Sequence, residues 1–303
     1  MIEKGDELFI NAHPPRVAGS CLLNIMLRIQ NKYTLYDGLI YQSTHGLFKK
    51  KQVSNLLEMH PDKRFISSHG ITLDLPFDRK NLIAIAFVRD PIEKIRSHYS
   101  WARTLEADDE FPEAKKLSFE DFVEKFVFKK EKSKVNSILS RFMINQIDFF
   151  FPEVCNKKEK LINLMEQKRL LLFPVENFDE VCVLLERMFP EFFYDLSYSE
   201  SINPTTKKKL SGNISNELKE CDNLQNDYNL MKLSKLFLKK SINNFFKSNY
   251  DFNSAIESFK RRCLKKKIGQ FQGKISHNIS HFLSVNTIKS QNIIIDFLLK
   301  NRS

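Results

Sequence analysis

The feature that most constrains the fold is a series of short apolar runs, each followed by a turn and then by a helical pattern of apolar residues. The two clearest runs are Leu8-Phe9-Ile10 and the stretch from Leu82 to Phe87. Runs of this length suit strands that are buried on both faces of a parallel sheet, with helices as the crossovers. The sequence therefore predicts a three-layer α/β/α fold with a central, mainly parallel sheet.

The same patterns predict where the elements lie along the chain. Strands are expected at residues 7–11, 64–68, 82–88 and 169–175. Helices are expected at residues 20–31, 91–106, 118–130, 133–149, 177–189 and 214–248. Two polar stretches are interpreted as loops, of which the first could border an acceptor cleft: residues 106–116 and 197–215.

The loop after the first strand combines a cation, small residues and a hydroxyl. It reads His13-Pro14-Pro15-Arg16-Val17-Ala18-Gly19-Ser20-Cys21-Leu22 and leads into a helical pattern. A helix N-terminus has unpaired N–H groups and a partial positive charge, so it favours an anion. Gly19 allows close approach of a ligand, Ser20 can cap the helix or bind a phosphate oxygen, and Arg16 adds a planar donor fork. An ordinary strand-to-helix turn with a surface arginine explains this loop alone equally well.

The second turn reads Phe87-Val88-Arg89-Asp90-Pro91, and its helical pattern contains Ser97, eight residues after Arg89. Pro91 suits the first turn of a helix. Ser97 then lies nearly two turns into the helix, on a face that Arg89 could share. The two side chains could therefore hold one phosphate group. The competing interpretation is a surface Arg–Asp pair and a solvated serine.

Together, the two segments resemble the nucleotide-binding motifs of sulfotransferases that use 3′-phosphoadenosine 5′-phosphosulfate (PAPS). The first is similar to the 5′-phosphosulfate loop, usually Pro-Lys-x-x-x-Ser/Thr. The second is similar to the 3′-phosphate motif, Arg-Asp-Pro with a serine eight residues after the arginine. The likeness is greatest to the carbohydrate branch, which includes heparan and chondroitin sulfotransferases and bacterial relatives. Arg16 stands where that family usually has lysine, and Cys21 replaces a frequent Ser or Thr.

The resemblance implies a P-loop-kinase-like topology and a set of PAPS-binding residues. Weaker likeness is found in Phe65 to Gly70, which contains His69, in Phe173 to Glu180, and in Asn226 to Lys240, so the resemblance covers residues 8–250. In the segment Ser137 to Met143 only Arg141 fits well. The residues implied for the nucleotide are Arg16, Val17, Ala18, Gly19, Ser20, Cys21, Leu22, Arg89, Ser97 and Arg141.

Sulfuryl transfer, like phosphoryl transfer, depends on positioning and charge stabilisation, and it needs a base for the acceptor hydroxyl. Arg16 is the candidate cation at the leaving oxygen, with Ser20 and the loop N–H groups as donors. His69 is the candidate base, because it ends a predicted strand and lies twenty residues before Arg89, as in the family. Among the other histidines, His13 could support the site and His98 more simply packs. No metal-ligand cluster is found in the sequence, and we expect none to be needed.

The composition agrees with one large α/β domain of 303 residues, 42% of them hydrophobic. No apolar stretch approaches the ~18 residues of a membrane helix, and the first residues lack the apolar core of a signal peptide. The five cysteines are scattered, without a Cys-x-x-Cys pair, which is typical of free thiols in a reducing compartment. We therefore expect a cytoplasmic protein.

The positive charge is concentrated near the C-terminus. Residues 255–303 contain ten Lys or Arg and two acidic residues, a net charge of +8 out of +11 for the chain. The sequence predicts a sulfotransferase domain at residues 1–254 and a basic extension at residues 255–303. The extension is either a solvated helical face or a docking patch for an anionic glycan, a membrane surface or a nucleic acid. The apolar run from Ile293 to Leu299 could pack on the body or on a partner.

The sequence thus predicts a PAPS-dependent transfer to a hydroxyl acceptor. The family branch favours a carbohydrate, while a lipid, a small metabolite or tyrosine stays open. A nucleotide-dependent kinase of related fold would need a Walker lysine, which the first loop lacks. A non-catalytic binder of anionic glycan or nucleic acid would depend on the basic extension and would not need His69.

Overall fold

The computed structural model describes residues 6–36, 47–79, 81–104, 115–129, 146–152, 156–199 and 212–285. The strands are β1 (Leu8–Ala12), β2 (Thr34–Tyr36), β3 (Phe65–Ser68), β4 (Leu82–Val88) and β5 (Leu170–Pro174). The α-helices are α1 (Gly19–Ile29), α3 (Lys50–Met59), α4 (Pro91–Ala102), α5 (Phe119–Val123), α7 (Gln146–Phe150), α8 (Lys157–Glu166), α9 (Phe178–Met188), α10 (Gly212–Glu220), α11 (Asp222–Phe245) and α12 (Asn249–Val285). Short 3-10 helices span Asn31–Tyr33 and Val175–Asn177, and a π-helix spans Glu124–Phe128.

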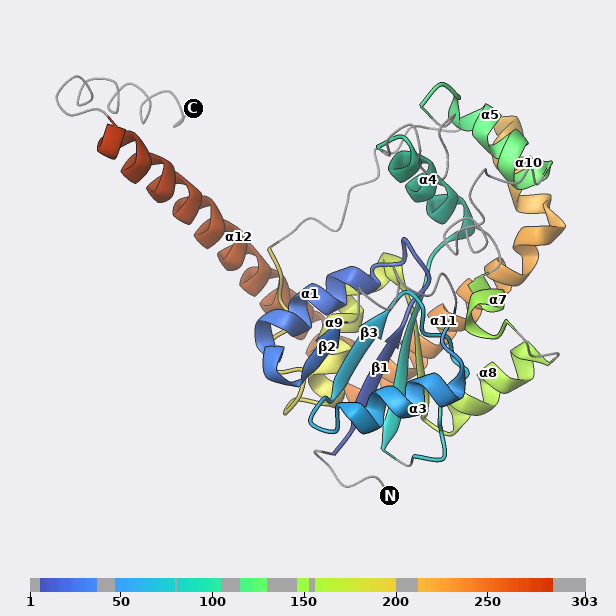
Figure 1. The fold of residues 1–303 in the computed structure, drawn as a ribbon, viewed down its shortest axis with the longest axis horizontal. Coiled ribbons are helices and arrows are strands. Elements are labelled where there is room, and N and C mark those ends of the chain that lie inside the picture. Colours follow the sequence, from blue (N-terminus) through green and yellow to red (C-terminus); the bar gives the residue numbers. More distant parts are fainter. Residues whose placement is uncertain are drawn as a thin grey trace. The chain divides into compact units, whose positions relative to one another are not determined.

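The five strands form one parallel sheet in the order β2-β3-β1-β4-β5 (Figure 1). β1 is central, and its Ile10 lies between Ile66 of β3 and Ala84 of β4. The carboxyl ends of β3, β1 and β4 are therefore neighbours at one edge of the sheet. Loops that follow these three strands meet there, whatever their separation in the sequence.

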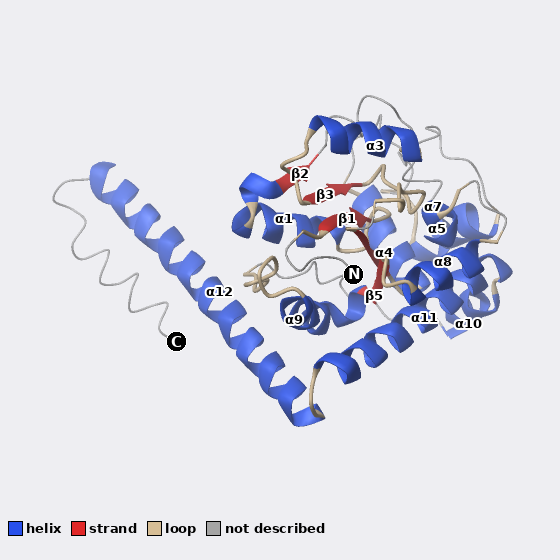
Figure 2. Cartoon of the chain, turned by 90° about the horizontal axis from the view of Figure 1, so that it is seen from below, coloured by secondary structure: helices blue, strands red, loops and turns tan. Residues whose placement is uncertain are grey.

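Alternate residues of each strand point to opposite faces of the sheet, and both faces are packed. Ile10, Ala84 and Leu172 belong to the core that includes side chains of α3, α7 and α8. On the opposite face, the Phe9 ring lies 4.7 Å from Phe193, between ring centroids. Figure 2 shows α3 on one side of the sheet and α1 and α9 on the other. The predicted three-layer α/β/α fold with a parallel sheet is confirmed.

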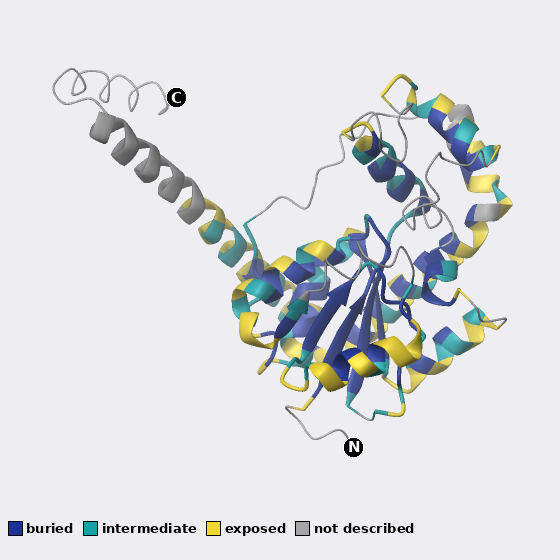
Figure 3. Ribbon diagram, viewed as in Figure 1, coloured by how far each residue is buried: buried dark blue, intermediate teal, exposed yellow. Residues whose placement is uncertain are grey.

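A further, smaller core lies among helices rather than on the sheet. It joins Ile95 of α4, Phe122 of α5, Leu218 of α10 and Leu224 of α11. Figure 3 shows the contrast between the buried strands β1, β3, β4 and β5 and the helices, which expose one side. α4 begins directly after β4, so the second turn leads straight into this helical cluster.

All four predicted strands are present to within one residue at each end. The prediction missed β2, which has only three residues, and α3 and α8, whose sequences are dominated by lysine and other polar residues. The predicted helix 214–248 is two helices, because the chain turns at Cys221 between α10 and α11. The predicted helix 133–149 is described only at Gln146–Phe150, and most of the two predicted loops lies outside the described residues.

The chain divides into two compact units. One comprises residues 1–196 and 201–256, and the other comprises residues 197–200 and 257–303. α12 runs without interruption across residue 255, where the basic extension was expected to begin. The run from Ile293 to Leu299 lies outside the described residues. Among the helices that are described, none combines the length and apolarity needed to cross a bilayer.

Candidate active site

Three of the predicted functional side chains follow three adjacent strands. Arg16 follows β1, His69 follows β3, and Arg89 follows β4. Parallel pairing brings these strand ends together at one edge of the sheet, the edge at which α/β sheets bind ligands. The sheet order thus explains how residues separated by more than fifty positions share one site.

The first loop leaves the start of α1 open to an anion. Ala18 is the N-cap and has no side-chain acceptor for the first N–H groups of the helix. The backbone N–H groups of Gly19 and Ser20 have no protein acceptor within the described part of the chain. Arg16 and Ala18 also have left-handed backbones, with φ of 69° and 58°. Such residues form the concave nests of N–H groups that bind anions, and their strain is typical of functional turns.

Gly19 is required by a close contact within the loop. A Cβ atom at Gly19 would lie 1.9 Å from Cγ of His13. The His13 ring is almost fully buried, with Nδ1 3.1 Å from the carbonyl oxygen of Asn11. Asn11 in turn donates from Nδ2 to the carbonyl oxygen of Gly19 at 3.1 Å. The sequence indicated a glycine for ligand approach, and the structure adds that His13 occupies the space of the missing side chain.

Replacing Gly19 with alanine should therefore displace the His13 ring and destabilise the protein by about 1–3 kcal/mol, the usual cost of an overpacked core. Urea unfolding measures this loss. Ser20→Ala is the matched control, because Ser20 is exposed one residue further along, and its effect should stay within about 0.5 kcal/mol. Equal stability of the two variants would mean that the His13 contact does not constrain position 19.

The second turn is built as its sequence predicts. Asp90 caps α4, and its Oδ1 accepts hydrogen bonds from the N–H groups of Ile92 at 3.0 Å and Glu93 at 3.2 Å. Pro91 occupies the first helical position. Asp90 is therefore a helix cap, and its charge also acts on Arg89, where it opposes the lowering of the pKa by burial. Ser97 is buried on α4, with 2% of its surface exposed.

The arginines of the two turns link them directly. Arg16 Nε donates to Ser97 Oγ at 3.1 Å, and Arg89 Nη1 donates to the carbonyl oxygen of Arg16 at 3.1 Å. Burial lowers the pKa of both arginines, and the charge of Arg89 lowers the pKa of Arg16 further. No carboxylate of the described residues forms an ion pair with Arg16. A half-buried cation beside a second cation is stabilised when an anion binds next to it.

His69 lies beside the first loop. Its ring packs against that of His13 with centroids 4.4 Å apart and an interplanar angle of 63°. Burial lowers the pKa of His69, a hydrogen bond with the His13 backbone opposes this, and the charge of Arg16 lowers the pKa again. The net shift is downward, so His69 is neutral at neutral pH. The neutral imidazole is the form that accepts a proton.

Two buried residues that the sequence did not single out as site residues hold the backbone of Arg89. Gln146 Nε2 donates to the carbonyl oxygen of Arg89 at 2.8 Å, and Gln146 Oε1 accepts from the Arg89 N–H at 2.9 Å. Asp227 Oδ1 accepts from the N–H of Gln146 at 2.6 Å. No feature of the sequence pointed to Gln146, because it lies 57 positions from Arg89. Asp227 lies in the segment from Asn226 that resembles the family, and a buried acid in an amphipathic helix is a usable signal.

Lys94 and His98 add buried titratable groups one and two turns into α4. Lys94 is fully buried, and burial lowers its pKa to about 8, opposed by Asp227 and reinforced by Arg89. Lys94 therefore remains charged at neutral pH and adds to the positive potential near Arg89. Burial, Lys94 and Arg16 together lower the pKa of His98 to about 3. The His98 ring packs edge-on against Trp101, with centroids 5.3 Å apart.

His98 should make the protein sensitive to acid. Its pKa rises from about 3 in the folded chain to an ordinary value near 6.5 in the unfolded chain, so below pH 6.5 only the unfolded state takes up the proton. The contribution of the neutral His98 ring to the free energy of unfolding is therefore fully present above pH 6.5, and it is lost as the pH falls toward 3. At pH 5 the loss is about 2 kcal/mol. Urea unfolding at pH 7.5 and at pH 5 measures the free energy of unfolding lost between the two. The loss should be smaller for His98→Phe than for the wild type, and equal losses would contradict this role of His98.

The remaining residues predicted for the nucleotide differ in which groups they could present to a ligand. Val17 and Leu22 are buried apolar side chains, so they can reach a ligand only through their backbone. The N–H groups of Cys21 and Leu22 donate to the carbonyl oxygen of Ala18 at 2.9 and 3.3 Å, inside the helix. Ser20 is exposed at the helix start. Arg141 lies outside the described residues.

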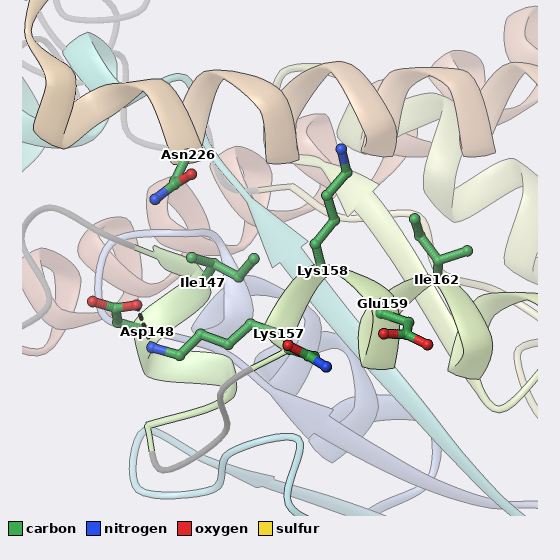
Figure 4. A pocket seen from close by; sticks show the side chains of 8 residues that line it. Ile147, Asp148, Lys157, Lys158, Glu159, Ile162 and Asn226 are labelled. Carbon is green, nitrogen blue, oxygen red and sulfur yellow. Dashed lines mark hydrogen bonds and ion pairs between the residues drawn. The ribbon is translucent and has the colours of Figure 1, made fainter.

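An open pocket of about 640 Å³ lies apart from these loops, between α7, α8 and α11 (Figure 4). Its lining has both signs of charge: Ile147, Asp148, Asn156, Lys157, Lys158, Glu159, Ile162 and Asn226. Lys157 Nζ is paired with Asp148 Oδ1 at 2.6 Å. Because Lys157 is paired with Asp148 and Glu159 adds a second acid, this pocket is a poorer anion site than the turns after β1 and β4. Within the described ranges, no three His, Cys, Asp or Glu side chains come together as a metal site.

No model of a known protein family matches the sequence, and no curated protein is similar to it in sequence. Among solved structures, the chain is similar to the crystal structure of a sulfotransferase from Alicyclobacillus acidocaldarius. The two sequences are 11% identical, the likeness covers 75% of this chain and 94% of that chain, and the TM-score is 0.45. A likeness of this size does not bear on activity, so the function rests on the residues of the site.

Proposed function

We propose that the protein transfers a sulfuryl group from PAPS to a hydroxyl acceptor. The observation that carries the proposal is the meeting of Arg16 and Arg89 beside the uncapped start of α1. Two cations and a row of free N–H groups suit a ligand with negative charge at two positions. PAPS is such a ligand, and the two turns resemble the motifs that bind it.

The residues of the chain can be assigned to the two charged ends of the nucleotide. Arg16 and the N–H groups of Gly19 and Ser20 would hold the 5′-phosphosulfate, where their charge stabilises the leaving oxygen. Arg89 and Ser97 would hold the 3′-phosphate. Arginine stays protonated at neutral pH, so Arg16 stabilises charge and does not deliver a proton. The bound nucleotide supplies the sulfuryl group, and the protein supplies its orientation.

His69 would remove the proton of the acceptor hydroxyl. The support for this role is its place after β3, its contact with the His13 ring and its lowered pKa, which keeps the ring neutral. A neutral ring beside the first loop is in the form that can accept the proton of a hydroxyl group. For the acceptor we propose a carbohydrate, because the turns resemble most closely the carbohydrate branch.

Titration calorimetry with PAPS, with its product adenosine 3′,5′-bisphosphate and with Mg²⁺–ATP tests the proposal. We expect both 3′-phosphorylated nucleotides to bind at least tenfold more tightly than ATP, because Arg89 and Ser97 then have a partner. Tighter binding of Mg²⁺–ATP would instead indicate a kinase. Binding of none of the three would contradict the proposal. Transfer of labelled sulfate to a panel of sugars, lipids, small metabolites and tyrosine peptides then identifies the acceptor class.

A further inference from the structure

α12 presents an apolar pair surrounded by basic residues. Leu264 and Ile268 lie one turn apart and are 57% and 48% exposed. At 3.6 residues per turn, basic residues lie on both sides of this pair. The outer face of α12 consists of these six exposed residues: Lys260, Arg261, Leu264, Lys265, Lys267 and Ile268. Glu257, which pairs with Lys260 at 3.4 Å, is the one acidic residue between positions 257 and 268 of the sequence.

On the opposite side of α12, three residues contact Ser197 and Tyr198 of the same unit. Phe259 is fully buried, and its ring lies 6.1 Å from that of Tyr198. The N–H of Tyr198 donates to Cys263 Sγ at 3.3 Å, and Lys266 Nζ donates to the carbonyl oxygen of Ser197 at 3.1 Å. These contacts fix the rotation of the helix about its axis. The outer face is therefore left to solvent or to a partner.

We propose that the outer face of α12 binds the surface of an anionic lipid bilayer. Leu264 and Ile268 would enter the boundary between headgroups and acyl chains, and the flanking Lys and Arg side chains would contact lipid phosphates. Long basic side chains suit this arrangement, because their stems cover apolar surface while their charges stay among the headgroups. The sequence continues the three- and four-residue spacing of apolar residues with Phe271 and Ile275.

The composition of the face favours a bilayer over two other occupants. An anionic polysaccharide or a nucleic acid would pair with the cations but has no apolar layer in which to bury Leu264 and Ile268. A second copy of the chain would bring Lys265 and Lys267 of one helix close to the same basic residues of the other, and like charges repel. A bilayer with anionic headgroups satisfies both the apolar pair and its basic surroundings.

Sedimentation of the full chain with lipid vesicles tests the proposal. The protein should bind vesicles rich in phosphatidylglycerol and not vesicles of phosphatidylcholine alone. The double variant Leu264→Ser/Ile268→Ser should lower binding about tenfold without a change of charge. Arg261→Gln and Lys265→Gln should each lower it about fivefold. The control Met59→Ser, at a 67% exposed apolar residue of α3, should bind like the wild type.

All substituted side chains are exposed, and thermal unfolding checks that each variant is folded. The proposal is overturned if the wild type does not bind phosphatidylglycerol vesicles. It is also overturned if the double variant binds them as well as the wild type does, because the attraction would then be purely electrostatic, as for a polyanion. A wild-type dimer that Leu264→Ser/Ile268→Ser dissociates would replace the bilayer with a second copy. None of these measurements depends on sulfuryl transfer.

Discussion

Replacement of His69 with alanine should lower the turnover of sulfuryl transfer by about 10²–10⁴-fold, the usual contribution of a general base, and leave nucleotide affinity nearly unchanged. The ring lies beside the first loop but is not among the groups assigned to the nucleotide. Steady-state kinetics with saturating acceptor, together with calorimetry of adenosine 3′,5′-bisphosphate, separates the two effects. His60→Ala is the control, since His60 ends α3, is half-exposed and is not a site residue.

The pH dependence gives a second test of the same role. Because the pKa of His69 is lowered, the basic form persists below pH 6.5. Turnover should therefore stay constant through pH 6.5 and fall only at a lower pH, as the lowered pKa is reached. The acidic limb should disappear in His69→Ala. Unchanged turnover in this variant would refute the role of base. An equal loss of nucleotide affinity would show that His69 acts by supporting the first loop through His13.

Replacement of Arg89 with alanine should weaken the binding of adenosine 3′,5′-bisphosphate by about 1.5–3 kcal/mol, the range of charge-assisted hydrogen bonds. The backbone of Arg89 is held by the side chain of Gln146, so the turn should keep its place when the guanidinium group is removed. Calorimetry measures the loss. The effect should shrink for a nucleotide without the 3′-phosphate.

Arg103→Ala is the matched control for charge. Arg103 is exposed at the other end of α4, where it lies over the Tyr99 ring, so the variant loses one positive charge on the same helix outside the site. Nucleotide affinity should change little, because an exposed charge at that distance is screened by salt. Equal losses in the two variants would mean that Arg89 contributes only to the general positive potential.

The sequence by itself determined the elements that depend on local patterns. Apolar runs of strand length predicted β1, β4 and β5, because a strand buried on both faces is mostly apolar. Pro91 predicted the start of a helix after β4, because proline favours the first helical turn. β2 could not be predicted in this way, because three residues are too few to show a periodic pattern of apolar side chains.

Only the tertiary structure decided which of these local elements meet. The sheet order places β1 between β3 and β4, and so brings Arg16, His69 and Arg89 to one edge. It also decides that Arg16 bonds to Ser97, a partner 81 positions away. A short motif contains no information on strand order, which follows from the packing of helices on the two faces of the sheet.

The same is true of the groups that support the site. Gly19 is needed because the buried His13 ring takes the place of a side chain, and this contact exists only after the loop has closed. Gln146 and Asp227 are an ordinary amide and acid in the sequence. They hold the Arg89 backbone because folding buries them together, where each buried polar group must find a partner. The sequence therefore indicated which residue types form each turn, and burial and packing decided which distant residues become their partners.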